Sequence, residues 1–246
     1  GHVIECGAQA TGGNCQLDWQ STPDFAHIGY PIIEARANGE MVITKQAGTG
    51  GRVTQATVKE QLLYEIGDPR SYMTPDVVAD FTSLQLSDDG PDRVRIGSAE
   101  GGPRPAQLKV SVSYHYGWKA VGTLVYSAPD ASAKAQAAEK IVRQRLTDLN
   151  LNFEKIHTEF FGINACHAHL APPIPEPAEV QVRIGARAGE KLAIERFTRE
   201  VIPLVLNGPP TATGYGEGRP QVREVVAYWP ALVPREAVAT RVEVIE

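Results

Sequence analysis

The stretch Lys119-Ala-Val-Gly-Thr-Leu-Val-Tyr126 decides the fold class, because its period-two alternation is followed at once by a helical pattern. Such alternation predicts a β-strand with one face on a core, and the helix is expected from Asp130, as its N-cap, to about Leu149. Further patterns predict strands at 153–163 and 179–186, a helix at 190–206 kinked near Pro203, and strands at 222–228 and 239–245. From Lys119 the order is therefore β-α-β-β-α-β, which is the order of a ferredoxin-like α/β sandwich.

The part of the chain before this stretch predicts a hairpin and a separate glycine-rich segment. Residues 109–116 also alternate, and Gly117-Trp118 is expected to turn the chain so that they pair with 119–126. Nearer the N-terminus we expect strands around 3–4, 31–35, 41–44, 77–81 and 93–96, and a helix at 54–66 capped by Thr54 or Thr57. The sequence thus predicts an α+β protein with a largely antiparallel sheet and helices on one face. Its expected domains are 1–105, a strand-loop-helix segment, and 106–246, the sandwich with extra strands.

Composition limits the classes of function that fit the chain. It has 246 residues, a formal net charge of −5, and three cysteines that lie far apart, Cys6, Cys15 and Cys166. An odd number of separated cysteines favours free thiols in a reducing compartment, so we expect a soluble, cytoplasmic protein. No run of about 18 apolar residues occurs, which excludes a membrane span. Without an excess of basic residues, nucleic acid is not expected as a partner.

The segment Glu5-Cys-Gly-Ala-Gln-Ala-Thr-Gly-Gly-Asn14 holds the first candidate site. Glu5 and Cys6 are expected at the end of a strand, where they would form an acid-base or nucleophile pair and are the candidate catalytic residues. Glycines at a strand end let a ligand approach and free backbone amides to hold an anion. The candidate ligand-binding residues here are Gly7, Thr11, Gly12, Gly13 and Asn14. In the alternative interpretation, Cys6 is a small buried hydrophobic residue and the glycines only make a turn.

A second glycine-rich segment, 41–54, predicts a strand, a loop and the start of a helix. This arrangement aims loop amides and a helix N-terminus at one point, which suits a phosphate or a carboxylate. The candidate anion-binding residues are Lys45, Gly48, Thr49, Gly50, Gly51 and Arg52. The segment is neither a Walker A loop nor a dinucleotide-binding pattern, so its loop has the alternative role of joining strand to helix.

A third candidate is Asn164-Ala-Cys-His-Ala-His169, in which Cys166, His167 and His169 stand close together. Neither the paired cysteines nor the paired histidines of structural zinc sites occur at the usual spacing, so no metal is assigned. We instead expect His167 and His169 to take part in proton transfer.

These motifs together resemble those of the acyclic terpene utilisation family, called AtuA-like. The likeness rests on His2-Val-Ile-Glu-Cys-Gly7 with the following residues to Asn14, on Ile43-Thr-Lys45 with 48–54, and on 60–69, 72–81, 90–94 and 229–235. Members of this family have an α/β half before the Glu-Cys-Gly segment. The resemblance therefore implies that the chain is a C-terminal portion, with a missing N-terminal half as a partner.

The resemblance implies a metabolic enzyme or enzyme subunit in the catabolism of acyclic terpenoid or branched acyl-CoA or carboxylate compounds. The reaction is not specified by it. A small anionic substrate, with a CoA thioester as the candidate, is expected, as is a homo-oligomer. A non-catalytic module that mediates assembly of a multi-subunit enzyme is the competing hypothesis, and a zinc enzyme is the third.

Overall fold

The structure, a computed structural model, describes residues 1–17, 19–214 and 218–244, in two compact units. Unit 1 comprises residues 1–110 together with the C-terminal residues from 231, and unit 2 comprises residues 111–230. The first division lies close to the domain boundary expected after residue 105. The sequence does not indicate that the C-terminal residues return to unit 1.

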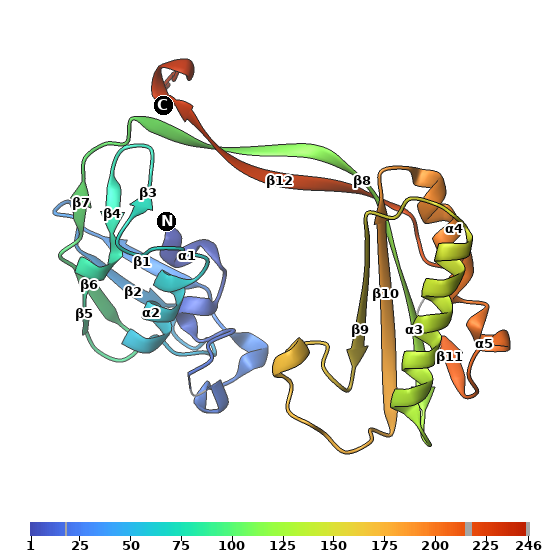
Figure 1. Cartoon of the computed structure of the whole chain (residues 1–246). Helices are drawn as coiled ribbons and strands as arrows, with labels where there is room; N and C mark the ends of the chain where they lie inside the picture. The colour runs from blue at the N-terminus through green and yellow to red at the C-terminus, as the bar shows by residue number, and fades with distance from the viewer. Residues whose placement is uncertain (18, 215–217, 245–246) are drawn as a thin grey trace. The chain divides into compact units, whose positions relative to one another are not determined.

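Unit 2 is built on one antiparallel sheet with its long helices on one face (Figure 1). The strands are β8 (Gln107–Ser127), β9 (Lys155–Phe161), β10 (Glu179–Ala188), β11 (Ala212–Gly214) and β12 (Arg223–Pro234). Their order is β11-β8-β10-β9, and β12 also pairs with β8. The helices are α3 (Ala131–Asp148), α4 (Lys191–Val201) and the short α5 (Leu204–Asn207). The predicted α+β class with an antiparallel sheet is confirmed, whereas the closer likeness to a ferredoxin-like sandwich stays a prediction.

The core of unit 2 explains why the helices cover one face of the sheet. Alternate residues of β10, from Val180 to Ala188, are buried, and the residues between them are not. Helix α3 presents a stripe of alanines and Val142 to these strands, and α4 adds Ile194 and Phe197. Small alanine side chains let α3 approach the sheet closely, and the burial of these apolar groups is the main force that holds the unit together.

The hairpin predicted around Gly117 is wrong, because residues 107–127 form one continuous strand, β8. Gly117 has a φ of +85°, and a Cβ there would lie 2.4 Å from the carbonyl oxygen of Ala188. The next residue, Trp118, pairs with Ala188 in the register of β8 with β10. The glycine therefore permits a close approach between two strands that are distant in sequence, and it does not reverse the chain.

The helices of unit 2 agree in part with those predicted from the sequence. The predicted break at Pro203 is confirmed, since α4 ends at Val201 and α5 begins at Leu204. Asp130 holds the N-cap position of α3, but its side chain makes no capping hydrogen bond. Glu176 instead accepts a hydrogen bond from the Ser132 amide at 2.9 Å.

The strand predicted at 239–245 is wrong for residues 239–244, which have no regular structure, and Ile245 lies outside the described residues. Over the described ranges, no helix combines the length and apolar content that crossing a membrane requires.

Unit 1 contains two small antiparallel sheets and one helix of regular length. The first sheet has the order β1-β2-β6-β5, from β1 (Pro31–Ala35), β2 (Met41–Lys45), β6 (Val94–Gly97) and β5 (Gln85–Asp88). The second has the order β3-β4-β7, from β3 (Tyr72–Met73), β4 (Val78–Asp80) and β7 (Glu100–Gly102). Helix α2 (Gln55–Leu63) packs on the core that Ile43, Val94 and Ile96 form from the first sheet.

Residues 2–5 form a short helix, α1 (His2–Glu5), where the sequence predicts a strand. Val3 is buried in the same core as Val58 and Leu62 of α2, and the side-chain amide of Gln61 donates to the His2 carbonyl at 2.9 Å. These contacts with α2 override the weak β-preference of valine and isoleucine over so few residues. Glu5 and Cys6 consequently lie at the end of a helix.

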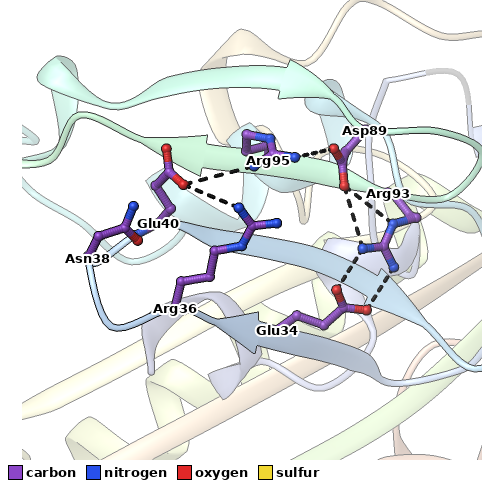
Figure 2. A network of polar contacts seen from close by, with 7 residues as sticks. All are labelled: Glu34, Arg36, Asn38, Glu40, Asp89, Arg93 and Arg95. Carbon is purple, nitrogen blue, oxygen red and sulfur yellow. Dashed lines mark hydrogen bonds and ion pairs between the residues drawn. The ribbon is translucent and has the colours of Figure 1, made fainter.

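A network of charges ties the first sheet of unit 1 together (Figure 2). Arg93 donates to both carboxylate oxygens of Glu34, at 2.7 and 2.6 Å, and so fixes β1 to the start of β6. Arg95 of β6 donates one hydrogen bond to Asp89, the residue after β5, at 2.5 Å. The three arginines drawn are matched by three carboxylates, of Glu34, Glu40 and Asp89. The ion pairs of this network stabilise the sheet. Because its charges balance, the network offers no net charge to a ligand.

Thr57 joins α2 to the N-terminal segment. It completes a capping box with Thr54, and its hydroxyl also donates to the Ala10 carbonyl at 2.8 Å. The side chain is buried, so these groups have no access to water as a substitute.

Replacing Thr57 by valine keeps the shape of the side chain but leaves the Ala10 carbonyl and the Thr54 amide without a partner. We expect Thr57→Val to lower the free energy of unfolding by about 1–3 kcal/mol in urea titration. The matched control is Thr82→Val, at an exposed threonine whose hydroxyl donates to Asp80; water can replace this bond, so the substitution should change the free energy of unfolding by about 0.5 kcal/mol or less. Equal effects of the two substitutions would contradict the role given to Thr57.

Candidate functional site

The two glycine-rich motifs lie against each other in unit 1. The Arg52 amide donates to the Thr11 carbonyl at 2.8 Å, and the Thr11 hydroxyl donates to the Gly29 carbonyl at 2.5 Å. The Gly51 amide donates to the Pro23 carbonyl at 2.7 Å. The structure thus brings together two segments that the sequence predicts to line one site.

Close backbone packing explains the glycines of these motifs. Gly51 has a φ of +79°, and a Cβ there would lie 2.4 Å from the Thr11 carbonyl oxygen. A Cβ at Gly50 would lie 2.1 Å from the carbonyl oxygen of Asp24. A side chain at Gly51 would force the two motifs apart, and one at Gly50 would clash with the loop at Asp24, so both contacts require glycine.

Most of the backbone amides of these loops already have partners within the chain. Gly12 and Gly13 donate to carbonyls of the preceding turn, at Gln9 and Ala8, and Gly50 donates to His27. An anion held by these amides would have to replace bonds that the fold uses. Anion binding by Gly7, Gly12, Gly13, Gly48, Thr49, Gly50 and Gly51 stays a prediction.

Lys45 is engaged inside unit 1. Its side chain is only 7% exposed, and its ammonium group donates to the Thr49 carbonyl at 2.7 Å. The same group lies 3.5 Å from Asp92, whose other carboxylate oxygen accepts from the Val53 amide. The charge of Lys45 is therefore balanced by Asp92 and fixes the loop before α2.

Glu5 and Cys6 gather with a third residue, Glu65, at the end of α1. Ligand atoms of the three residues lie within 4.8 Å of one another, and both carboxylates are exposed. Glu5 also lies 3.2 Å from Nδ1 of His2. The sulfur and two carboxylates could approach a cation, but exposed acidic groups gather without one in many proteins, so no metal is assigned.

A pocket of about 950 Å³ runs along α2, between this helix and the N-terminal loop. The loop contributes Gln9, Asn14, Gln16 and Leu17, and the helix and its end contribute Gln55, Ala56, Lys59, Glu60, Leu63, Tyr64 and Glu65. Asn14 is a predicted site residue that lines this pocket. Glu65 lines this pocket, and its carboxylate also lies close to Glu5 and Cys6.

Glu60, which lines this pocket, is hydrogen-bonded to the buried thiol of Cys15. Cys15 Sγ donates to Glu60 Oε2 at 2.9 Å, and the Gln16 amide donates to Glu60 Oε1 at 2.7 Å. Burial raises the pKa of the Cys15 thiol, and the hydrogen bond to Glu60 raises it further. Burial also acts to raise the pKa of Glu60, but the bonds from Cys15 and the backbone outweigh it and hold that pKa below its ordinary value. At neutral pH the pair is a neutral thiol beside a carboxylate, which makes Cys15 a poor nucleophile.

The sequence gives no indication of the Cys15–Glu60 pair. The two residues are 45 positions apart, and the motif around Glu60 predicts only a helix. Their contact depends on how the N-terminal loop lies on α2, which no spacing rule encodes.

His167 and His169 belong to unit 2, beside a short 3-10 turn at Ala168–Leu170. Both side chains are exposed, and Cys166 next to them is exposed as well. Their expected role in proton transfer stays a prediction, as nothing in their surroundings in unit 2 specifies it.

Comparison with known proteins adds one finding. The family model of the acyclic terpene utilisation family protein AtuA matches residues 1–244. The chain belongs to this family. Membership suggests a role in acyclic terpene utilisation and confirms the resemblance given by the motifs. The AtuA match spans both glycine-rich motifs and the pocket along α2, while no curated protein and no solved structure matches the chain.

The Cys15–Glu60 contact predicts how the thiol titrates. In a Cys6→Ser, Cys166→Ser background, alkylation of Cys15 should show a pH midpoint above the ordinary thiol value of about 8.5. Glu60→Gln should lower this midpoint, because it removes the carboxylate that favours the protonated thiol. The raised pKa also stabilises the fold at pH values below about 8.5, and this contribution is lost as the pH rises through the folded-state pKa. A midpoint that Glu60→Gln leaves unchanged would contradict the contact.

Proposed function

We propose that this AtuA-family chain is an enzyme, or a subunit of one, that acts on branched acyl-CoA or carboxylate compounds from acyclic terpenoids. The observation that carries the proposal is the pocket along α2. Its volume, about 950 Å³, is in the range of sites for small organic ligands. Family membership supports the substrate class.

The apolar part of the pocket suits a hydrocarbon chain. Leu17 and Leu63 are 62% and 55% exposed, and they line the same pocket with Ala56. Large apolar side chains that are exposed together favour an apolar ligand, because covering them removes their surface from water.

The polar part of the pocket suits the carboxylate or phosphate groups of the same substrate. Lys59 is exposed in the pocket and has no hydrogen bond or ion pair among the described residues, so its charge is available to a carboxylate or a phosphate. Glu65 lines this pocket and lies close to Glu5 and Cys6. We retain Glu5 and Cys6 as the candidate catalytic residues. Glu60 lines the pocket, and its bonds to Cys15 and Gln16 position the loop.

Binding of the hydrocarbon part can be tested without knowing the reaction. Isothermal titration calorimetry with a branched acyl-CoA should show about tenfold weaker binding to Leu63→Ser than to the wild-type chain, because apolar contact is lost. Lys59→Gln should weaken binding of the free acid. Leu63 is largely exposed, so its substitution should leave the fold intact.

The matched control is Leu206→Ser, at a leucine of α5 that is 94% exposed and outside the pocket. It should leave the affinity unchanged. If the acyl-CoA fails to bind at millimolar concentration, or if Leu63→Ser and Leu206→Ser bind it equally, the assembly module becomes the better account.

A further inference from the structure

The sheet of unit 2 has a second face, turned away from α3 and α4 (Figure 1). On β10 this face carries Gln181, Arg183, Gly185 and Arg187, because the residues between them are buried under the helices. The strand registers place Lys119 of β8 and Lys155 of β9 opposite Arg187, one on each side. Three cationic side chains thus start from one row across three strands.

This row is unfavourable unless something compensates for its charge. Neighbouring strands lie about 4.8 Å apart, and like charges directly opposite each other destabilise a sheet. Arg187 has partners, since it forms an ion pair with Glu154 and its guanidinium lies 3.9 Å from the ring centroid of Tyr116. Lys119 and Lys155 have no hydrogen bond or ion pair among the described residues. Two positive charges are therefore left without a counterion in the part of the chain that the structure describes.

Two adjoining hollows lie beside the row, and a third next to them, which shares His157 and Gly185, includes the Glu159 carboxylate. In the next row, Val121 and His157 stand opposite Gly185, which has no side chain, and this leaves a hollow of about 180 Å³. A second hollow of about 380 Å³ shares Lys119 and Val121 with the first and is also lined by Arg219 and Arg223. The lining of both hollows includes lysine, arginine and histidine side chains and, over the described residues, no carboxylate.

The carboxylates nearest to this surface are already engaged. Glu159 binds Arg183 and lies 3.8 Å from Nε2 of His157, and Glu154 binds Arg187. Neither neutralises Lys119 or Lys155. Among the described residues, therefore, no carboxylate balances the charge of the hollows.

We propose that this face binds a small soluble molecule with a diphosphate group. Lys119 and Lys155, together with the arginines of the adjoining hollow, carry more positive charge than a single carboxylate neutralises, whereas two linked phosphates supply several negative charges. Gly185 and Val121 provide a floor without polar groups, which leaves room for the part of the ligand beside the phosphates. This site lies in unit 2 and does not rest on the function proposed for the pocket along α2.

Inorganic pyrophosphate is the probe, titrated calorimetrically into the full chain at fixed ionic strength. Lys119→Gln and Lys155→Gln should each weaken binding about tenfold or more, and the double variant should abolish it. Without the ligand, both variants should melt at the same temperature as the wild-type chain or at a higher one, because they relieve like-charge repulsion. A merely structural role for the lysines would lower the melting temperature.

Two further variants separate the site from general electrostatic attraction. Lys140→Gln removes an exposed lysine from α3, on the covered side of the sheet, and should bind pyrophosphate like the wild-type chain. Gly185→Val should fill the hollow and weaken binding without unfolding the sheet, since a Cβ there would be 3.6 Å from its nearest neighbour. Undetectable binding at millimolar pyrophosphate, or equal loss in Lys140→Gln and Lys119→Gln, would overturn the proposal.

Discussion

Contact between two backbone segments without side chains between them organises unit 1. Gly51 lies so close to the Thr11 carbonyl that a Cβ would be 2.4 Å from its oxygen, and the Arg52 amide bonds to that carbonyl. This contact holds the N-terminal loop beside the start of α2. Thr57 and Gln61 of α2 then bind the carbonyls of Ala10 and His2, so loop and helix are joined at successive turns. The pocket and the Cys15–Glu60 pair exist because of this attachment.

The glycines therefore have a structural role in addition to the anion binding that their pattern predicts. Glycine-rich loops next to helices often bind anions through free amides, and that expectation followed from the sequence alone. In this chain the amides of Gly50, Gly51 and Arg52 bond to carbonyls of the N-terminal half of unit 1. The sites proposed for ligands involve side chains: Lys59 and Leu63 in the pocket, and Lys119 and Lys155 on the open sheet face.

Local patterns were sufficient where the neighbours in sequence are also the neighbours in space. The cap of α2 at Thr54 and the break at Pro203 follow from a few adjacent residues, and both are confirmed. The hairpin prediction at Gly117 was wrong because this glycine permits the close approach of β10, a strand about seventy positions away in the sequence. The Cys15–Glu60 pair and the cationic row around Arg187 were not predicted for the same reason. They depend on which segments pair, and alternation along one strand does not specify its partner.

Amide hydrogen exchange tests most directly the claim that the loop amides hold the two segments together. The account predicts that the Gly50, Gly51 and Arg52 amides exchange as slowly as the Val58 amide, which bonds within α2 to the Thr54 carbonyl. All four would then open only when unit 1 unfolds. Exchange of the three loop amides at rates near those of an unfolded chain, with Val58 still protected, would contradict it and would leave these amides free for a ligand.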